Sequence, residues 1–188
     1  LGDVYKRQVN KLIDYLGWQK QNNQKWFVGL PLLSGRLVGE KKLTIRKLVE
    51  KYNLDLRLTP NQDVLICNIL NKNKNEIELE LNDIGYENLD DINEIQRHAL
   101  ACPALPLCGL AMTEAERILP NILERIDNLL KSLNIEKTIL FRITGCPNGC
   151  SRPYMAELAL VGSGLNKYQL WLGGSKNLQR LAKPYLQR

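Results

Sequence analysis

Two short stretches of this sequence decide how the rest of the chain is interpreted: Ala101-Cys-Pro-Ala-Leu-Pro-Leu-Cys-Gly109 and Thr144-Gly-Cys-Pro-Asn-Gly-Cys150. Each holds two closely spaced cysteines, and a glycine or a proline adjoins every one of the four. Four thiolates brought to one point make an all-cysteine metal site, for which an iron–sulfur cluster and zinc are the first candidates. Glycine and proline suit a backbone that wraps closely around a cluster and points its N–H groups at sulfur.

A disulfide framework and a structural zinc site are the alternatives to an iron–sulfur cluster at these cysteines. A disulfide framework fits poorly, because the chain is long and its five cysteines are an odd number. Zinc ligands are usually separated by about two to four residues, whereas five residues, two of them proline, separate the first pair here. The spacing alone leaves iron–sulfur and zinc open. Cys67 lies in the apolar run 64–67 and is predicted to be a buried strand residue rather than a ligand.

The stretch 101–174 resembles the siroheme-binding half of assimilatory sulfite reductases, most nearly the ferredoxin-dependent kind of cyanobacteria and plastids. Beyond the cysteine stretches, the matching motifs are Thr113-Glu-Ala-Glu-Arg-Ile-Leu-Pro120, Arg152-Pro-Tyr-Met-Ala-Glu157 and Trp171-Leu-Gly-Gly174. Upstream, Tyr15-Leu-Gly-Trp18 and the segments 51–53 and 59–62 are also similar, so the resemblance extends from Val9 to Tyr185. The apolar residues 103–107 favour sulfite, because polar residues are expected there in the related siroheme nitrite reductases.

The resemblance implies an enzyme that reduces sulfite to sulfide with electrons passed from ferredoxin through a [4Fe-4S] cluster to siroheme. In that family the equivalents of Cys102, Cys108, Cys146 and Cys150 hold the cluster, and Cys150 by its position also bridges to the siroheme iron and acts in catalysis. A siroheme nitrite reductase and the hemoprotein subunit of an NADPH-linked sulfite reductase are alternative enzymes. A structural module with a zinc ion on the four cysteines, or with no cofactor, is the alternative from another class.

Five further residues are candidate siroheme-binding residues: Asn148, Arg142, Arg152, Asn61 and Gln62. The two arginines flank the second cysteine pair and could bind the carboxylates of the macrocycle bidentately. A salt bridge to an acid such as Glu157 would account for them equally well. Asn148 could donate to a cluster sulfur or to the siroheme edge, or it could simply form a turn. The polar segment 57–62 could contact the macrocycle, but a plain connection between two strands is slightly favoured.

Composition and charge are consistent with this interpretation. With 188 residues, 44% of them hydrophobic, the chain can bury one or two cores, and its apolar runs are too short to span a bilayer. The net charge of +6 is uneven, because residues 138–188 hold seven basic side chains and a single acid, Glu157. Aromatic content is only 6% and no nucleic-acid motif is visible. The basic excess therefore indicates a carboxylate-rich cofactor or an acidic partner such as ferredoxin, rather than nucleic acid.

The chain is expected to comprise a ferredoxin-like nitrite/sulfite reductase repeat over 9–75 and a siroheme- and cluster-binding domain over 76–188, incomplete at its C-terminus. Residues 1–8 have no counterpart in the family and are expected to be a non-native leader. The family extends beyond both ends, so a fragment of a cytoplasmic or plastid-stromal enzyme is expected. The N-terminal half of the enzyme, which binds sulfite in the family, would be missing from this chain, and the fragment alone is expected to be inactive.

Periodicity predicts an α+β fold. The resemblance implies that its first region is a ferredoxin-like α/β sandwich and that the α+β siroheme- and cluster-binding domain follows. In the first region, strands are expected over 26–30, 54–58 and 63–69 and an amphipathic helix over 43–52, with helices on one face of an antiparallel sheet. In the second, Thr113 and Glu116 form a capping-box pattern that predicts a long helix. Pro120 should kink this helix or mark its start. Further strands are expected over 138–143, 157–161 and 168–172.

Overall fold

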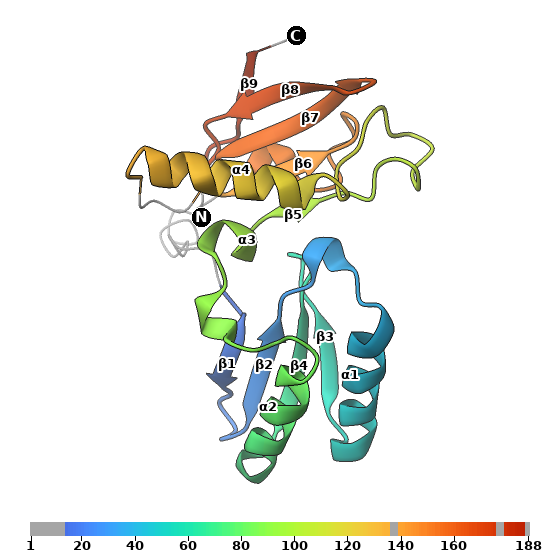
Figure 1. The fold of residues 1–188 in the computed structure, drawn as a ribbon, viewed down its shortest axis with the longest axis vertical. Coiled ribbons are helices and arrows are strands. Elements are labelled where there is room, and N and C mark those ends of the chain that lie inside the picture. Colours follow the sequence, from blue (N-terminus) through green and yellow to red (C-terminus); the bar gives the residue numbers. More distant parts are fainter. Residues whose placement is uncertain (1–13, 136–138, 176–178, 187–188) are drawn as a thin grey trace, which may run out of the picture. The chain divides into compact units, whose positions relative to one another are not determined.

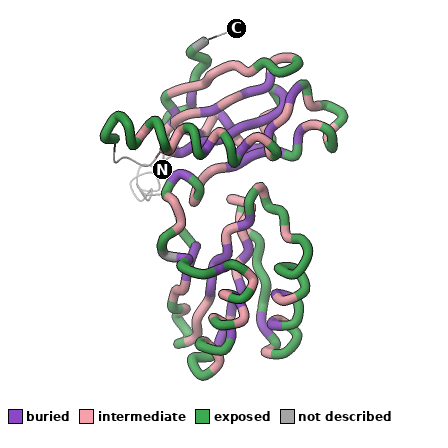
Figure 2. The backbone as a smooth tube through the Cα atoms, viewed as in Figure 1, coloured by how far each residue is buried: buried purple, intermediate pink, exposed green. Residues whose placement is uncertain are grey.

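The computed structural model describes residues 14–135, 139–175 and 179–186, so the expected leader at 1–8 lies outside the described residues. The described chain forms two compact units that divide between Asn93 and Glu94 (Figure 1). Each unit has its own sheet and its own hydrophobic core. Figure 2 shows the buried residues concentrated along the strands of each sheet. Both units combine helices with a sheet, which confirms the predicted α+β class.

The first unit is built on a four-stranded antiparallel sheet with the strand order β1-β2-β4-β3. Its strands are β1 (Gly17–Lys20), β2 (Trp26–Leu30), β3 (Asp55–Leu58) and β4 (Val64–Ile69). Its helices are α1 (Gly39–Tyr52) and α2 (Lys74–Asn82), with short 3-10 turns η2 (Leu33–Gly35), η3 (Asn71–Asn73) and η4 (Leu89–Asp91). The core lies between the sheet and the two helices, as the sequence predicted.

Side-chain alternation explains how this layer forms. Val28 of β2 pairs with Ile66 of β4, and both side chains are fully buried in the core. Helix α1 buries Ile45 and Leu48 in the same core. The helix ends where Asn53 takes a left-handed conformation with φ 50°, a common way to stop a helix. It begins at Gly39, four residues earlier than the predicted start at residue 43.

Cys67 occupies the position that the sequence predicted. It lies in β4 and is 4% exposed, and burial raises the pKa of its thiol. Its strand partner is Asp55 of β3. This cysteine belongs to the first unit, whereas the other four belong to the second.

The division between the units falls later than the expected boundary after residue 75. Helix α2 inserts Ile77 and Leu81 into the core of the first unit, and Tyr86 and Leu89 follow them. The polar run 71–75, which is consistent with a loop or the lead-in to a helix, forms the turn η3 and the start of α2. Tertiary packing of an amphipathic helix therefore outweighs the local polarity of its first residues.

The second unit contains a five-stranded sheet with the order β5-β6-β7-β8-β9. Its strands are β5 (Leu100–Ala101), β6 (Phe141–Thr144), β7 (Leu158–Gly164), β8 (Lys167–Leu172) and β9 (Lys183–Leu186). The first three are parallel to one another, and β8 and β9 are antiparallel to their neighbours. Its helices are α3 (Glu94–Arg97) and α4 (Leu119–Ser132), with a 3-10 turn η5 (Pro153–Met155). The strands expected over 138–143, 157–161 and 168–172 are present as β6, β7 and β8, although β6 begins only at Phe141, and β5 and β9 were not predicted.

Helix α4 begins at Leu119 rather than at Thr113, so the predicted capping box does not start it. Pro120 lies in its first turn, where a missing N–H leaves no hydrogen bond unmade. Thr113 is 1% exposed, and its hydroxyl donates a hydrogen bond to Tyr168 Oη at 2.9 Å. Thr113 therefore ties the loop that precedes α4 to strand β8. None of the helices among the described residues has the length and apolar character needed to cross a bilayer.

The placement of α2 in the first core can be tested with two substitutions on that helix. We expect Ile77→Ala to lower the free energy of unfolding by about 2–5 kcal/mol, because Ile77 is fully buried and its loss leaves a cavity. Leu79→Ala is the matched control, since Leu79 is 65% exposed and should change stability by less than about 1 kcal/mol. Denaturant unfolding measures both, and equal losses would contradict the packing of α2 described here.

Candidate metal site

The two cysteine stretches begin at the ends of neighbouring parallel strands. Strand β5 ends at Ala101, directly before Cys102, and β6 ends at Thr144, two residues before Cys146. Ala101 pairs with Ile143, and the Cys102 N–H donates to the Ile143 carbonyl at 3.3 Å. Because both strands run in the same direction, the loops that follow them leave the sheet at the same edge. The topology thus brings together two motifs that are more than thirty residues apart in the sequence.

Hydrogen bonds join the two loops directly. The Gly145 N–H donates to Cys102 Sγ at 3.2 Å, and the Thr144 hydroxyl lies 3.5 Å from the same sulfur. In the opposite direction, the N–H groups of Met112 and Thr113 donate to the Gly145 carbonyl at 2.8 Å and 3.2 Å. Gly145 is therefore the residue through which each loop holds the other. Donation from N–H to sulfur stabilises a thiolate, as expected around a metal–thiolate site.

Close packing explains why residue 145 is a glycine. A Cβ atom there would lie 2.6 Å from the Ala104 Cβ and 2.7 Å from the Thr113 carbonyl oxygen. Both distances are far below van der Waals contact, and one partner is backbone that cannot rotate away. Gly149, in the second loop, has a φ of +68°, a conformation that side chains disfavour. The glycines that flank the cysteines of the second loop are thus required by geometry, as the sequence suggested.

The four sulfur atoms themselves are less closely grouped than predicted. Cys102 and Cys146 are buried, Cys108 is half-buried and Cys150 is exposed. Among the residues that the structure describes, no three histidine, cysteine or acidic side chains lie close enough together to hold a metal ion. The expectation that all four Sγ atoms surround one small space is therefore not met here. Neutral thiols attract one another only weakly, and coordination to a metal is what would draw thiolates to a common centre.

Arg142 is a buried cation beneath the second cysteine loop. It lies in β6, is 3% exposed, and donates from Nη1 to the Arg152 carbonyl at 2.9 Å. Its Nε has no hydrogen-bond partner in the described structure. Burial, with a contribution from the like charge of Arg152, lowers the pKa of Arg142 to about 10. The salt bridge considered between Arg142 and Glu157 is not formed; the Glu157 carboxylate accepts a hydrogen bond from the Leu140 N–H.

Arg152 shares this environment. It has a left-handed φ of 56° at the start of η5, and burial lowers its pKa. Two guanidinium groups are thus held close enough for their charges to interact, and one of them carries an unsatisfied N–H. A buried cation with an unmade hydrogen bond is costly unless an anion approaches it. This part of the site therefore has the electrostatics of an anion-binding position.

The remaining candidates are less informative. Asn148 is exposed within the second loop. Asn61 and Gln62 belong to the first unit, in the turn between β3 and β4, where the Asn61 N–H donates to Thr59 Oγ1 at 3.2 Å. Burial raises the pKa of the adjacent Asp63 to about 6. The turn thus has the form of a strand-to-strand connection, and a role for Asn61 and Gln62 in a site formed by the second unit stays a prediction.

Sequence reasoning missed the residues that support the two loops. The Ser151 hydroxyl donates to the Ile143 carbonyl at 2.7 Å, and Tyr154 packs edge-on against Trp171 with ring centroids 4.8 Å apart. Tyr168 Oη donates to the Glu114 carbonyl at 2.7 Å, besides accepting from Thr113. Tyr154 and Trp171 lie in motifs that carry the family resemblance, which was the available signal. The structural roles of these residues depend on partners up to fifty-five residues away, which no local pattern reveals.

Comparison with known proteins gives consistent findings for both units. Residues 19–84 match the family model of the nitrite/sulfite reductase ferredoxin-like half domain. The chain is 49% identical over 180 residues to a ferredoxin-type sulfite reductase of Synechococcus elongatus, in a match that covers 93% of this chain and 29% of that protein. It is 37% identical over 199 residues to the NADPH sulfite reductase hemoprotein beta-component of Staphylococcus saprophyticus, covering 94% and 35% respectively. The chain thus spans about a third of the length of these curated relatives.

A solved structure shares the fold. The Mycobacterium tuberculosis NirA protein superposes with a TM-score of 0.81 at 23% identity, covering 96% of this chain and 35% of that one. At this level of identity the likeness concerns the fold alone.

The role of Gly145 in joining the loops can be tested by adding a single methyl group. We expect Gly145→Ala to destabilise the chain by about 1–3 kcal/mol through overpacking against Ala104 and Thr113. The buried Cys102 thiol should then react faster with iodoacetamide, as measured by mass spectrometry. Gly109→Ala is the matched control in the same region, because nothing lies within 4 Å of a Cβ at that position. A Gly145 variant as stable and as unreactive as the control would refute this role.

Proposed function

This chain is a homologue of the sulfite reductases, and we propose that it forms part of an enzyme that reduces sulfite to sulfide. The overall reaction adds six electrons and seven protons to sulfite and yields hydrosulfide and three molecules of water. The single observation that carries the proposal is the junction in which Gly145 of one cysteine loop donates a hydrogen bond to Cys102 of the other. Because the chain spans about a third of its relatives, the residues that grip sulfite would come from polypeptide outside it.

The four cysteines of the two loops would hold a [4Fe-4S] cluster: Cys102, Cys108, Cys146 and Cys150. The donor set fits, since these are four free thiols on two loops that already bond to each other. When bound, such a cluster supplies one-electron transfer. The chain's own residues would tune it, because Gly145 and Thr144 direct donors at Cys102 and stabilise negative charge on its sulfur. The burial of Cys102 and Cys146 would keep water away from half of the ligand set.

Cys150 would also serve as a ligand to the iron of siroheme, and is the catalytic cysteine of our proposal. Its exposure supports this role, because a sulfur that is not enclosed by its own loop remains accessible to a second metal centre. With both groups bound, such a thiolate would couple the two centres electronically. Cys102 and Cys146 are enclosed and would bind the cluster alone.

Siroheme carboxylates are the anions that we assign to the pair formed by the buried Arg142 and the half-buried Arg152. Arg142 Nε is free of protein partners in the described structure, and Arg152 lies two residues after Cys150. Guanidinium groups suit carboxylates because their donors form a planar fork. Asn148, exposed between two cluster ligands, would donate to the cofactor edge, and Asn61 and Gln62 are proposed as contacts to the macrocycle. These three assignments rest on the polar side chains and on their positions in the sequence.

Ferredoxin is the electron donor that we favour. The basic excess of residues 138–188 would attract an acidic donor protein, and the ferredoxin-type relative from Synechococcus elongatus is 49% identical. Relatives of the NADPH type, at 37% and 40% identity, keep an NADPH-linked donor as the alternative. The enzyme would then act in the cytoplasm, or in the plastid stroma of a photosynthetic eukaryote. Nitrite is the alternative substrate, because the matched half domain is named for nitrite reductases too.

An assay of the full-length enzyme tests the proposal. The purified protein should show the visible absorption of siroheme and an iron–sulfur cluster, and should form sulfide from sulfite with photoreduced ferredoxin as donor. The ratio of kcat/KM for sulfite to that for nitrite distinguishes the two substrates. A coloured enzyme that prefers nitrite would replace sulfite in the proposal. A colourless protein that contains zinc would overturn the proposal and favour the structural-module alternative.

The assignment of the arginines predicts a selective loss of siroheme. In the full-length enzyme, Arg142→Lys and Arg152→Ala should lower siroheme content several-fold while cluster iron stays near the wild-type level, because the bidentate carboxylate contacts are lost. Arg125→Ala, on the exposed side of α4, is the control and should change neither. Absorption spectra together with iron analysis give both contents. An unchanged siroheme content in both arginine variants would contradict the siroheme-binding role, and these residues would then only stabilise the loop.

A further inference from the structure

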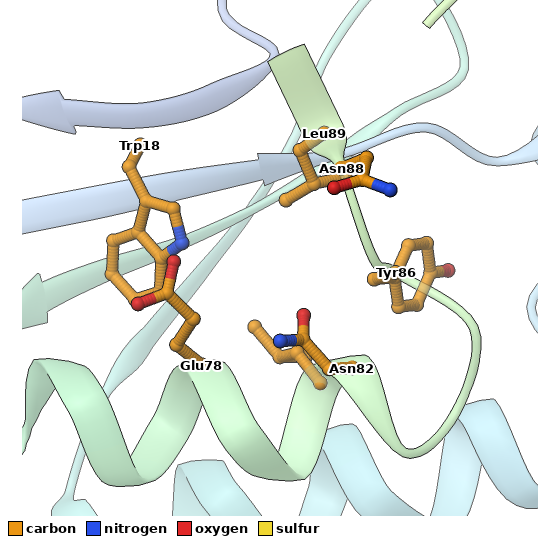
Figure 3. Close-up of a pocket in the computed structure, with 7 residues that line it drawn as sticks. Trp18, Glu78, Asn82, Tyr86, Asn88 and Leu89 are labelled. Atoms are coloured by element: carbon orange, nitrogen blue, oxygen red, sulfur yellow. The ribbon is translucent and has the colours of Figure 1, made fainter. Parts of the chain in front are cut away.

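A small cavity lies in the first unit, among residues that the proposed function does not use. It has a volume of about 200 Å³ and is lined by Trp18 of β1, Glu78, Leu81 and Asn82 of α2, and Tyr86, Asn88 and Leu89 of the following segment. Figure 3 shows the Glu78 carboxylate beside the Trp18 indole and the Asn82 amide directed toward the same space. All of its walls belong to one unit, so its geometry does not depend on the other.

The carboxylate and carboxamide side chains in this cavity have no hydrogen-bond or ion-pair partner among the residues that the structure describes. Glu78 and Asn82 are four residues apart on α2 and therefore lie on the same face of the helix. Across the described chain, the side chains of Glu78, Asn82 and Asn88 take part in no hydrogen bond or ion pair. By contrast, Glu76 and Glu80 on the same helix both pair with Lys51. One carboxylate and two carboxamides are thus left available around a single space.

The charge of the segment that lines the cavity favours the binding of a cation. Residues 75–96 contain eight acidic side chains and no lysine, arginine or histidine, although the whole chain carries a net charge of +6. Lys74, at the start of α2, is a cation on the same helix. Its ammonium lies over the rings of Trp18 and Trp26, at 5.1 Å and 4.5 Å from their centroids, instead of pairing with Glu78. The carboxylate in the cavity is therefore not neutralised by a direct ion pair.

The shape and chemistry of the walls select among cations. Trp18 contributes a flat aromatic surface, and Leu81 and Leu89 contribute apolar surface. A guanidinium group is planar, stacks on aromatic rings and offers several N–H donors in a fork that fits a carboxylate. An ammonium is compact and strongly hydrated, and it lacks the planar fork of donors with which a guanidinium pairs with a carboxylate. A volume of about 200 Å³ also exceeds what a bare ammonium needs.

We propose that this cavity is a binding site for a guanidinium group, with Glu78 as its carboxylate partner, the Asn82 and Asn88 amide oxygens as acceptors, and Trp18 and Leu89 as its walls. The source of the guanidinium is either a free arginine-like metabolite or an arginine side chain of a partner protein. The chemistry is the same in both cases. The proposal does not rest on sulfite reduction, because it involves neither the cysteine loops nor the arginine pair.

Titration of the 188-residue chain followed by NMR tests this site. L-argininamide is the probe, because it carries the guanidinium without a carboxylate that Glu78 would repel, and L-lysinamide is the matched ammonium. Argininamide should shift the indole N–H signal of Trp18 and the side-chain amide signals of Asn82 and Asn88 saturably, and lysinamide should bind clearly more weakly. Equal shifts with both probes, or shifts spread over all acidic residues, would overturn the proposal.

Variants then locate the binding. Glu78→Gln should weaken argininamide binding by about three- to tenfold, as expected for a charge-assisted contact that is partly exposed to solvent. Asn82→Asp adds a second carboxylate at constant size and should strengthen it. Glu80→Gln is the matched control, since it removes the same charge from the same helix outside the cavity. If argininamide binding were weakened equally in the Glu78 and Glu80 variants, the effect would come from the overall negative charge of the helix, and the proposed site would be refuted.

A further titration with a peptide distinguishes the two sources of the guanidinium. An acetylated and amidated peptide with a single arginine between glycines should bind at least as well as argininamide if the natural ligand is a side chain of a partner. If the natural ligand is a free metabolite, argininamide should bind and the peptide should be excluded by its backbone. Failure of both probes to bind would overturn the site. It would leave the proposed sulfite reduction untouched, because that depends on other residues.

Discussion

The hydrogen bond from the Gly145 N–H to Cys102 Sγ is the interaction on which the rest of the second unit depends. It exists because β5 and β6 are parallel neighbours, so that two cysteine loops leave the sheet at one edge. The Gly145 carbonyl also accepts hydrogen bonds from the N–H groups of Met112 and Thr113, and these bonds hold the segment after the first cysteine loop against the second loop. A residue with a side chain at position 145 would break this arrangement, since its Cβ would overlap Ala104. The fold thus brings the two thiol-bearing motifs together before any metal is considered.

The second constraint is the buried positive charge beneath these loops. Arg142 lies within the sheet, gives one hydrogen bond to the Arg152 carbonyl and keeps an unmade donor at Nε. Such an arrangement costs stability in an isolated chain, because burial disfavours the charged guanidinium and the two arginines repel each other. A bound carboxylate would remove that cost. Arg142 therefore lowers the stability of the chain while no anion is bound, and it contributes to stability once an anion binds.

The sequence predicts the features that depend on local pattern and on motif chemistry. It does not predict features that are determined by contacts between residues far apart in the chain. The strands at 26–30 and 168–172 follow from apolar alternation, and Cys67 was correctly placed on a buried strand. The helix start expected at Thr113 is wrong because Thr113 bonds to Tyr168, fifty-five residues away, whereas the alternative start at Pro120 is confirmed. The domain boundary was placed too early because Ile77 and Leu81 are buried by tertiary packing. The positions of the four sulfur atoms could not follow from the sequence, because they depend on coordination as well as on the fold.

The most direct test of the central claim is the iron and acid-labile sulfide content of the full-length protein purified without oxygen. We expect a Cys67→Ala variant to keep the wild-type amounts of cluster iron and acid-labile sulfide, because Cys67 lies in the first unit. We expect a Cys146→Ala variant that remains folded by circular dichroism to lose both. Zinc in place of iron, or equal loss of iron from the Cys67 and Cys146 variants, would contradict the assignment of the two joined loops as the cluster site.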